Sequence, residues 1–447
     1  FLTAHDTTES RAAAHEAGAE AYFRKPVDTQ ALLDAMRALS PEFVAIRQDI
    51  HAHPELAFEE RRTSDLVAER LQRWGYEVTR GLGGTGVVGQ LKRGTGTRKL
   101  GLRADMDALP VTERNVLPFA SKQTVLTDAG TSSGVMHACG HDTHMTAWIG
   151  AARRLSAMKS QWSGTLVMIG QPAEERVAGA KKMLEDGLFK RFPKPDTVIA
   201  FHDNSALPAG VIGYTDGPAL ANVDGIDIKV RGVGGHGAVP QLTRDPIVLA
   251  ARIVTSLQTL VSRETSPFDT AVVTVGSFHS GSKRNIISDE ANLQLTVRTY
   301  SPAVRAHLLD GISRIARGEA IAAGLPDDLM PIVTKDGESA DATFNTHDLT
   351  MRMARLFTDR FGPDRVKPVQ ASMASEDFGV FYLTDPSIQS LIFWVGGVPQ
   401  DKWDAAGGDV ARLPSLHSAL WAPDAEKVIA TASEALTAAA LDILARH

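Results

Sequence analysis

The densest group of chemically reactive side chains in the sequence lies in residues 135–144. This stretch holds three histidines, an aspartate and Cys139, which is the only cysteine of the chain. A thiolate together with imidazoles is a ligand set that suits a borderline-soft divalent metal ion. Because Gly140 separates Cys139 from His141, the backbone there is free to turn so that both side chains converge. The alternative is a buried cysteine among unrelated histidines, and this stretch alone leaves that alternative open.

Further candidate ligands stand where three short apolar runs end. The run at 100–104 precedes two aspartates, the run at 165–170 precedes two glutamates, and the run at 198–201 precedes a histidine. In chain order these polar residues are Asp105, Asp107, Glu174, Glu175 and His202. A carboxylate after a single strand is commonly a cap or turn residue. Three such strand ends beside a cysteine and histidine cluster favour one common site, to which a loop near the C-terminus adds His417. The sequence thus supplies enough ligands for two metal ions.

The elements around these residues predict an α/β fold. Apolar runs predict four strands, at 86–91, 100–104, 165–170 and 198–201. Helical patterns separate some of them, for example at 145–157 and 178–185. Strands that alternate with helices indicate a sheet that is at least partly parallel. In open sheets of this kind, ligands collect beyond the carboxyl ends of the strands. The strand-end residues are therefore expected to meet at one edge.

Length and composition limit the possible classes of protein. The chain has 447 residues, of which 43% are hydrophobic, and this is enough for two or three domains with their own cores. The formal net charge is −6 without a long run of one sign, which argues against nucleic acid and anionic membrane as main partners. A single cysteine excludes an internal disulfide, and no apolar run reaches transmembrane length. We therefore expect a cytoplasmic protein, although a sequence that begins with Phe1 says nothing about an upstream targeting segment.

Residues 1–40 differ from the rest of the chain and resemble the C-terminal third of a response-regulator receiver domain. In this comparison Thr3 matches the switch threonine, Lys25 the lysine, and Tyr22 or Phe23 the aromatic switch position. The phospho-accepting aspartate of that family lies upstream of the matching segment. A fragment that lacks most of its sheet cannot bury its apolar face, so a plain helical extension is the alternative. Neither interpretation predicts phosphorelay activity.

A different pattern begins at Asp224. Apolar and polar residues alternate over 226–230, which predicts a half-buried strand, and a glycine-rich turn with His236 follows. Two helices, at 246–261 and 304–323, and two strands, at 270–276 and 291–299, complete the pattern. These elements predict a separate α+β unit that ends near Lys335.

Two motifs are specific in combination: His-Ala-Cys-Gly-His-Asp at 137–142 and Gln-Pro-Ala-Glu-Glu at 171–175. Further matching stretches are 47–60, 103–110, 136–144, 235–236 and 416–417. Together they resemble the metallo-amidohydrolases that include hippurate hydrolases, aminoacylase-like enzymes and auxin-amino-acid hydrolases. The resemblance covers the chain from about residue 41 to its end, with the motifs in the family's order.

The resemblance implies a domain organisation. A catalytic α/β domain with a mixed, largely parallel sheet flanked by helices would comprise 41–223 and 336–447. A smaller α+β lid at 224–335 would interrupt it and mediate dimerisation. We therefore expect a homodimer or a higher homo-oligomer.

The resemblance also implies a role for each candidate ligand. Five residues would hold two divalent ions, with the thiolate between them: Cys139, His141, Glu175, His202 and His417. Glu174 would be the general base of amide hydrolysis, and Asp107 would orient a ligand imidazole. The expected ions are Mn2+ or Zn2+, with Co2+ or Ni2+ as alternatives. Asp105 stands outside the ligand set, because the cysteine-containing branch of the family lacks the histidine that other relatives have there.

The implied substrate is a small N-acyl or N-aroyl amino acid, or a related small amide. Lid residues match positions that reach it: His236, commonly across a dimer interface, and Asn285 and Arg298, which contact substrate or support the lid. The alternatives are a histidine in a glycine-rich loop and an arginine on the surface. Glu376 is expected near His417, or in a solvated acidic turn. The remaining histidines are expected to be structural or to support the ligands: His51, His53, His137 and His144.

Other activities are compatible with the sequence. A dipeptidase or an N-deacetylase of the same superfamily is one alternative, and a non-catalytic signalling fusion built on residues 1–40 is another. The complete ligand set favours an enzyme, because a degenerate sensor would be free to lose Glu174.

Overall fold

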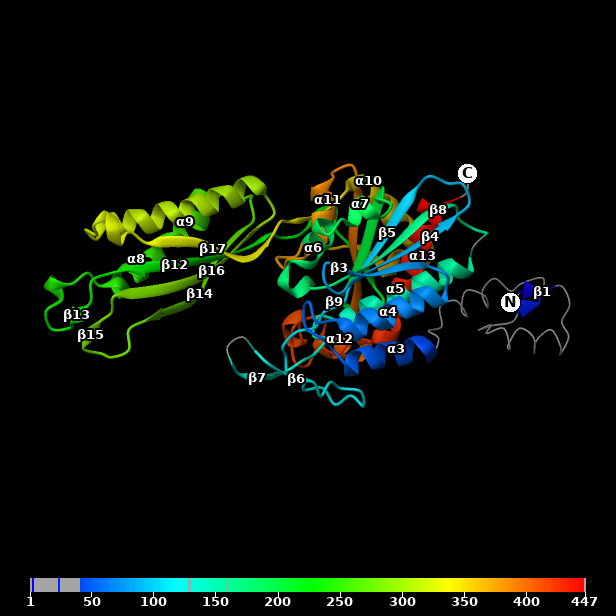
Figure 1. The fold of residues 1–447 in the computed structure, drawn as a ribbon, viewed down its shortest axis with the longest axis horizontal. Coiled ribbons are helices and arrows are strands. Elements are labelled where there is room, and N and C mark those ends of the chain that lie inside the picture. The colour runs from blue at the N-terminus through cyan, green and yellow to red at the C-terminus, as the bar shows by residue number, and fades with distance from the viewer. Residues whose placement is uncertain (1, 4–22, 25–40, 128–129, 159, 446–447) are drawn as a thin grey trace.

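The computed structural model describes residues 2–3, 23–24, 41–127, 130–158 and 160–445. In the first forty residues it describes one short parallel pairing, between β1 (Leu2–Thr3) and β2 (Phe23–Arg24). Of the residues that match a receiver domain, Tyr22 and Lys25 lie outside the described residues, as does most of residues 1–40. From residue 41 onwards the chain forms two units, which follow one another along the long axis of the molecule (Figure 1).

The larger unit is built on an eight-stranded sheet with the order β19-β10-β20-β9-β5-β8-β4-β3. Its four central strands are parallel to one another: β20 (Gln389–Val398), β9 (Thr197–Pro208), β5 (Lys99–Asp105) and β8 (Gly164–Gln171). The outer strands add antiparallel pairs: β4 (Gly86–Arg93) and β3 (Glu77–Leu82) beside β8, and β10 (Ile212–Tyr214) beside β20, with β19 (Val366–Pro368) at the edge. The predicted fold class, a mixed and largely parallel sheet flanked by helices, is confirmed.

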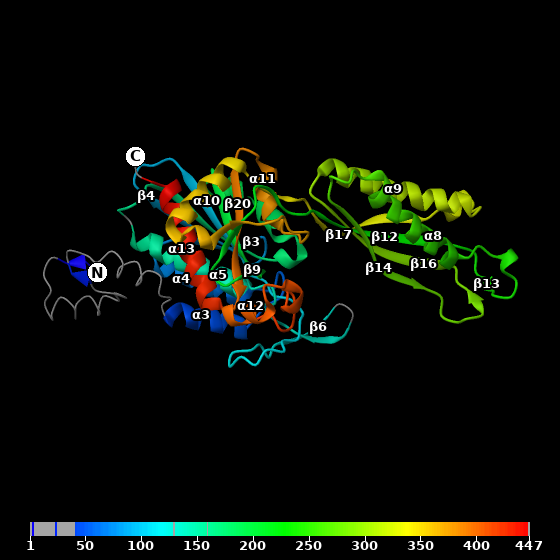
Figure 2. The ribbon, with the colours of Figure 1, turned by 180° about the vertical axis from the view of Figure 1, so that it is seen from behind.

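Helices cover both faces of this sheet (Figures 1 and 2). One apolar core lies beneath five helices: α3 (Pro41–Ala52), α4 (Arg61–Arg73), α5 (His141–Ala157), α10 (His347–Phe361) and α13 (Ala425–Ile443). A second core lies beneath three short ones: α6 (Gly179–Glu185), α7 (Leu188–Arg191) and α11 (Val380–Thr384). Because both faces are covered, central strands such as β8 are buried along almost their whole length. This double burial explains why they appear in the sequence as continuous apolar runs.

Smaller elements surround the sheet. They are the hairpin of β6 (Thr124–Leu126) and β7 (Ser132–Gly134), the pair β11 (Gly217–Leu220) and β18 (Thr343–Asn345), and helix α12 (Gln400–Ala406). The pair β11 and β18 lies where the chain passes between the two units.

The smaller unit is a four-stranded antiparallel sheet with the order β14-β16-β12-β17 and two helices on one face. Its elements are β12 (Val223–Arg231), α8 (Pro246–Thr259), β14 (Ala271–Ser280), β16 (Glu290–Thr299), α9 (Pro302–Ala322) and β17 (Ile332–Ala340). A short pair at its far end joins β13 (Gly235–His236) to β15 (Ile286–Ile287). This unit has an apolar core of its own. Its last strand runs past Lys335, because β17 is an edge strand whose second half is polar and gives no apolar alternation in the sequence.

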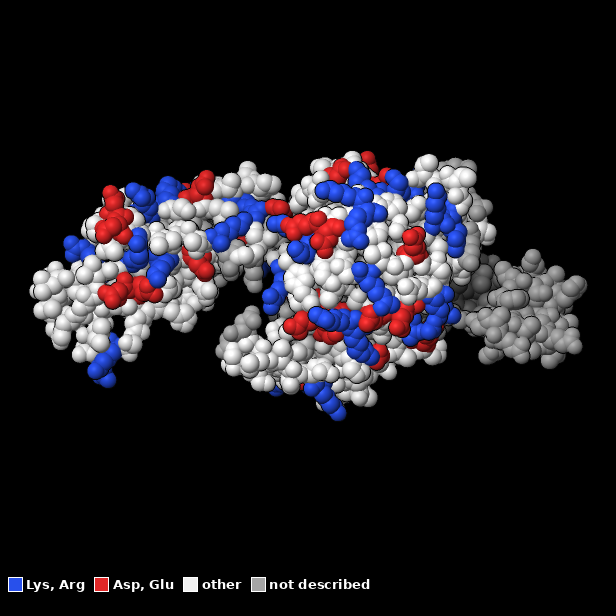
Figure 3. Space-filling view, in the orientation of Figure 1, with Lys and Arg blue, Asp and Glu red and all other residues white. Residues whose placement is uncertain are grey.

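The surface of both units is mixed in charge. On the face shown in Figure 3, basic and acidic side chains are interspersed over the described part of the chain. Within the described ranges, none of the helices is both long and apolar enough to cross a bilayer.

Candidate metal centre

The predicted strand-end residues meet at one edge of the central sheet. β5 ends at Asp105, β8 ends at Gln171 just before the two glutamates, and the neighbouring strand β9 carries His202. These strands are parallel, so their carboxyl ends leave the sheet on the same side. The expected convergence is therefore present.

Cys139 and His141 reach this edge from the start of α5. Gly140 between them has a φ of 83°, in the left-handed region that favours glycine. A Cβ at this position would lie 2.1 Å from the Oδ2 atom of Asp203, so a side chain has no room. Both the backbone conformation and the close approach to Asp203 require glycine here.

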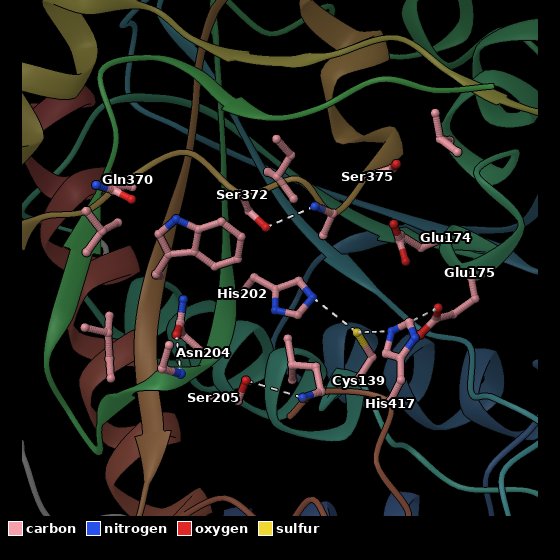
Figure 4. A pocket seen from close by; sticks show the side chains of 18 of the residues that line it. Cys139, Glu174, Glu175, His202, Asn204, Ser205, Gln370, Ser372, Ser375 and His417 are labelled. Carbon is pink, nitrogen blue, oxygen red and sulfur yellow. Dashed lines mark hydrogen bonds and ion pairs between the residues drawn. The ribbon is translucent and has the colours of Figure 1, made fainter. Parts of the chain in front are cut away.

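Figure 4 shows four of the five side chains predicted as ligands close together, and the fifth, His141, is grouped with Cys139 and His202. Sγ of Cys139 lies 3.5 Å from Nε2 of His202 and 3.2 Å from Nε2 of His417. Nε2 of His417 lies 3.5 Å from Oε2 of Glu175, whose Oε1 lies 3.8 Å from Nε2 of His141. Sulfur, imidazole nitrogen and carboxylate oxygen thus surround one small region. This is a donor set that zinc and related divalent ions accept.

Two buried polar atoms of the cluster make no hydrogen bond and could bind a cation instead. Among the described residues, Nε2 of His141 and Oε1 of Glu175 are buried and have no hydrogen-bond partner. A buried polar atom without a partner costs about 1–3 kcal/mol, and a metal ion would satisfy both atoms. Burial, reinforced by the carboxylates of Glu175 and Glu174, raises the pKa of the Cys139 thiol well above its usual range. A nearby divalent ion would offset this by stabilising the thiolate, so the donor set fits divalent metal ions.

Backbone carbonyls orient the two histidine ligands of the sheet edge. Nδ1 of His141 donates to the carbonyl oxygen of Asp107 at 2.8 Å, and Nδ1 of His202 donates to the carbonyl oxygen of Asp203 at 2.7 Å. A proton on Nδ1 leaves the lone pair on Nε2, the atom that faces the cluster. This arrangement is typical of metal-binding histidines.

The carboxylate of Asp107 holds the two glutamates. Its Oδ1 accepts the backbone N–H of Glu174 at 3.0 Å, and its Oδ2 accepts that of Glu175 at 2.9 Å. Asp107 was predicted to orient a ligand imidazole. Its backbone carbonyl is the atom that bonds to His141, while the carboxylate Oδ1 lies 3.5 Å from the same ring nitrogen. Asp107 therefore fixes the glutamate turn and one ligand together.

Glu174 lies beside the ligands without pairing closely with any of them. Its Oε2 is 3.9 Å from Nε2 of His141, and the side chain is almost fully buried. Burial, reinforced by Glu376 and Glu175, raises its pKa well above the usual range. A carboxylate with a raised pKa in a pocket is suited to take up a proton.

A buried polar layer supports the cluster from below. The backbone N–H of Asp203 donates to Nε2 of His144 at 2.9 Å, so Nδ1 of His144 carries the proton and donates to Oδ1 of Asp105 at 2.7 Å. Oδ2 of Asp105 lies 3.7 Å from Nε2 of His141 but accepts a hydrogen bond from Arg103 at 2.8 Å. Both oxygens of Asp105 are thus engaged, which is compatible with its expected place outside the ligand set.

Glu376 belongs to this layer and pairs with Arg103. Nη2 of the fully buried Arg103 lies 2.8 Å from Oε1 of Glu376, and Nε of Arg103 donates to Gln171 at 2.9 Å. The expected neighbour of Glu376 was His417, but its ion pair is with Arg103, and Glu376 is 1% exposed rather than part of a solvated turn. A charge this deeply buried needs an opposite charge, and the guanidinium provides it.

A second buried group of charges lies behind α5. Nδ1 of His51 is 2.9 Å from Asp142, and Nε2 is 3.0 Å from Glu113. Asp142 also pairs with Arg47 at 2.7 Å. Burial opposes protonation, but Asp142 and Glu113 together raise the pKa of His51 above its ordinary value. His51 therefore links the helix that carries His141 to the loop that carries Glu113.

A pocket of about 700 Å³ opens beside the cluster. Four of the predicted ligands line it, together with Glu174 and Arg298. Arg298 comes from the end of β16 in the smaller unit, and its Nη1 donates to the carbonyl of Met373 at 2.9 Å and to Oγ of Ser375 at 3.1 Å. Burial lowers its pKa, and no carboxylate is among its partners in the described chain. Arg298 thus brings a guanidinium without a counter-ion into the pocket.

The other two lid residues lie elsewhere. His236 and Asn285 are both exposed, and the pair β13 and β15 that carries or adjoins them sits at the end of the smaller unit far from the larger one (Figure 1). The backbone N–H of Ala238 donates to Nδ1 of His236 at 3.1 Å, so the ring proton is on Nε2 and faces away from that bond. Within the described chain, neither residue lines the pocket.

Several residues that shape the site received no role from the sequence. Arg103 neutralises the layer beneath the ligands, and Glu60 accepts the backbone N–H of Ala173 at 2.8 Å, where φ is 49° and the turn to the glutamates begins. Glu113 holds His51. A buried acid cannot be told from a solvated one in the sequence, because its burial depends on distant partners.

Comparison with known proteins agrees with this geometry. The pattern of "Peptidase family M20/M25/M40" matches residues 101–406. The hippurate hydrolase of Campylobacter jejuni is 38% identical over 78% of this chain and 87% of that protein. The N-acetylcysteine deacetylase of Bacillus subtilis is 33% identical over 83% of this chain and 92% of its own length.

A solved structure agrees as well. It is described as a dinuclear metal binding peptidase of the M20 family from Bacillus subtilis, is 28% identical, and has a TM-score of 0.72 over 92% of this chain and 99% of that one. The resemblance to metallo-amidohydrolases inferred from the motifs is confirmed. The chain belongs to the M20/M25/M40 peptidase family.

Proposed function

We propose that this protein hydrolyses the amide bond of N-acyl or N-aroyl amino acids with two divalent metal ions. The observation that carries the proposal is the ligand cluster, four of whose five side chains line one pocket together with Glu174 and Arg298. Relatives named hippurate hydrolase and N-acetylcysteine deacetylase act on substrates of this kind. Their names support the substrate class.

Five residues would hold the ions: Cys139, His141, Glu175, His202 and His417. Bound there, two divalent ions would lower the pKa of a water molecule and polarise the scissile carbonyl. The thiolate suits Zn2+, while the mixed nitrogen and oxygen donors also suit Mn2+, Co2+ or Ni2+.

Glu174 would move the proton. Its carboxylate takes the proton of the attacking water and delivers it to the nitrogen of the leaving amino acid. The hydrogen bonds from Asp107 to the backbone of both glutamates keep Glu174 and Glu175 in fixed and different roles. Glu175 would bind the metal ions, and Glu174, beside it in the same pocket, would stay free to move the proton.

Arg298 would bind the free carboxylate of the substrate. Its Nη1 is held by Met373 and Ser375, which fixes the guanidinium at the pocket wall. A half-buried guanidinium without a counter-ion is a strong binding site for a carboxylate. This contact would distinguish amino acid conjugates from neutral amides.

His236 and Asn285 would act on the site of a second subunit. Both are exposed at the far end of the smaller unit, so a partner chain is the natural place for their contacts. We assign the lid, predicted at 224–335, to the unit that runs from β12 to the end of β17 at Ala340, and the catalytic domain to the parts of 41–447 on either side of it. We propose a homodimer in which the lids exchange these residues.

The test is a turnover screen. The purified protein is stripped of metal, reloaded with Zn2+, Mn2+, Co2+ or Ni2+, and assayed against N-benzoyl and N-acetyl amino acids, dipeptides and the corresponding amino acid amides. Hydrolysis of the acylated amino acids with a free carboxylate is expected, and Glu174→Gln serves as the control for contaminating activity. Turnover of dipeptides alone would replace the proposal with a dipeptidase.

A further inference from the structure

The pocket extends away from the ligands along a row of three neighbouring strands. His202 on β9 is the register partner of Trp394 on β20, and Trp394 is the partner of Gly213 on β10. Residues directly opposite one another in a sheet point to the same face. The indole of Trp394 therefore stands next to a metal ligand, and their ring centroids are 5.6 Å apart.

Aliphatic side chains continue the row beyond the indole. A Cβ on Gly213 would lie 3.0 Å from Leu207 and 3.0 Å from Val369, so these two side chains occupy the space that Gly213 leaves open. Both pack against the same core as Trp394, and all three line the pocket. Trp394 is only 5% exposed, so packing fixes the orientation of its ring. This side of the pocket is a rigid apolar wall.

The side of the pocket opposite the indole carries the polar groups that the proposed reaction uses. Figure 4 shows Glu174 and Ser375 on one side of the pocket, and Asn204 and Gln370 on the other. Asn204 follows His202 on β9 and Gln370 follows Val369, so these two amides adjoin the apolar wall. Arg298 bonds to Ser375, and in the proposed function Glu174 protonates the leaving nitrogen. The leaving amino acid thus belongs on the side of Glu174 and Ser375, and the acyl group on the side of the indole.

We propose that Trp394, with Leu207 and Val369, forms an acyl subsite that selects planar aromatic acyl groups over acetyl. This inference rests on the proposed function and adds the acyl specificity to it. A benzoyl ring that extends from a carbonyl at the ligands would pack against the indole face and the two aliphatic side chains. An acetyl group is too small to reach most of this wall in a pocket of about 700 Å³.

The test compares kcat/KM for N-benzoylglycine and N-acetylglycine in the metal-loaded enzyme. The wild type is expected to favour the benzoyl substrate, and Trp394→Leu to lower the benzoyl to acetyl ratio by about tenfold, mainly through KM. Trp394→Phe keeps an aromatic face and is expected to retain most of the ratio. Trp403→Leu, a tryptophan of α12 outside the pocket lining, is the matched control and should keep the wild-type ratio.

Inhibition by the two acyl products, benzoate and acetate, provides a second measurement of acyl specificity. Benzoate is expected to inhibit the wild type at a lower concentration than acetate, and Trp394→Leu to reduce this difference. Metal content is measured in each variant, because Trp394 touches His202. An unchanged ratio in a fully loaded Trp394→Leu protein would overturn the acyl subsite and leave the proposed function standing. If the leucine variant does not fold, the same outcome in a fully loaded Leu207→Ala, Val369→Ala double variant would overturn it, because both side chains line the same wall. A wild type that cleaves neither substrate would overturn the proposed function itself.

Discussion

The ligand cluster and the far end of the smaller unit are two sets of predicted site residues built in opposite ways. In the cluster, side chains from β9, α5 and three connecting segments lie within a few ångströms of one another, and all of them except His417 are largely buried. Backbone carbonyls fix the rings of His141 and His202. At the far end, His236 and Asn285 are exposed, and the hydrogen bond given for the His236 ring is to its own loop. Within the described part of the chain, the predicted ligands meet one another, whereas neither His236 nor Asn285 lines the pocket.

The difference separates what a chain does alone from what it does in an assembly. In the proposed function, metal binding and proton transfer need only residues of the larger unit, and Arg298 reaches that unit from the base of the lid. His236 could assist the reaction only if a second chain placed its lid over the pocket. Variants that change one region at a time therefore test whether each region acts within one chain or between two chains.

The largest effects are expected inside the cluster, at the two adjacent glutamates. Glu174→Gln should lower kcat by about a thousandfold and leave the metal content near that of the wild type, because it removes the proton acceptor but no ligand. Glu175→Ala should lose metal as well as activity. Both are measured by steady-state kinetics and elemental analysis. Equal metal loss in the two variants would contradict the separate roles.

The next effect concerns the exposed histidine of the lid. His236→Ala should lower the rate by a factor on the order of one hundred to one thousand without loss of metal, because it removes a hydrogen-bond donor from the partner's site. His279→Ala, at another histidine of the lid sheet, is the matched control and should have little effect.

Mixing variants tests whether His236 acts between subunits. If it does, a mixed dimer of His236→Ala and Glu174→Gln has one site with both defects and one intact site, so activity should reappear after subunit exchange. If His236 acts within its own chain, every site keeps one defect and the mixture stays inactive. A fully active monomer would also refute the proposal.

Arg298 joins the two regions, and its removal should affect substrate binding more than chemistry. Arg298→Ala should raise KM for N-acyl amino acids by roughly 10- to 100-fold, as expected for the loss of a hydrogen bond between charged groups. KM for the matching neutral amides should change little. Arg317→Ala, at an exposed arginine of α9, is the control. A KM increase of the same size for the neutral amides would show that Arg298 supports the lid rather than the carboxylate.

The contrast between buried and exposed regions also explains which parts of the fold and the site could be predicted from the sequence. Continuous apolar runs predicted the central strands, because strands covered on both faces carry a strong signal, and the ligands followed from residue types at their ends. The partners of Glu376 and His51 were not predictable, because Arg103 and Glu113 lie far away in sequence and only the folded sheet brings them together. The end of β17 was missed because a polar edge strand shows no alternation.

A smaller effect, on thermal stability, is expected from the buried charged group around His51. The carboxylates of Asp142 and Glu113 raise the pKa of His51 in the folded state, so the folded protein holds this proton more tightly than the unfolded chain. Its contribution is fully present below the unfolded pKa of about 6.5 and is lost as the pH rises through the folded pKa. His51→Asn should therefore lower Tm most in acid, and the difference from wild type should shrink towards alkaline pH. His53→Asn, an exposed neighbour, is the control, and a constant difference in Tm across this range would contradict a protonated His51.

The smallest effect is expected from residues 1–40. Every strand of the eight-stranded sheet, and every ligand, comes from residue 77 or later, while α3 begins at Pro41. A chain that starts at residue 41 should therefore keep the same metal content and a kcat within a few-fold of the full chain. The measurement is kcat of both chains under the same metal load, with circular dichroism to establish that the shorter one is folded. A collapse in kcat of the folded, metal-loaded short chain would mean that the receiver-like segment belongs to the working enzyme. Residues 1–40, which supply none of the predicted ligands, would then be a third region that controls the activity of the ligand cluster.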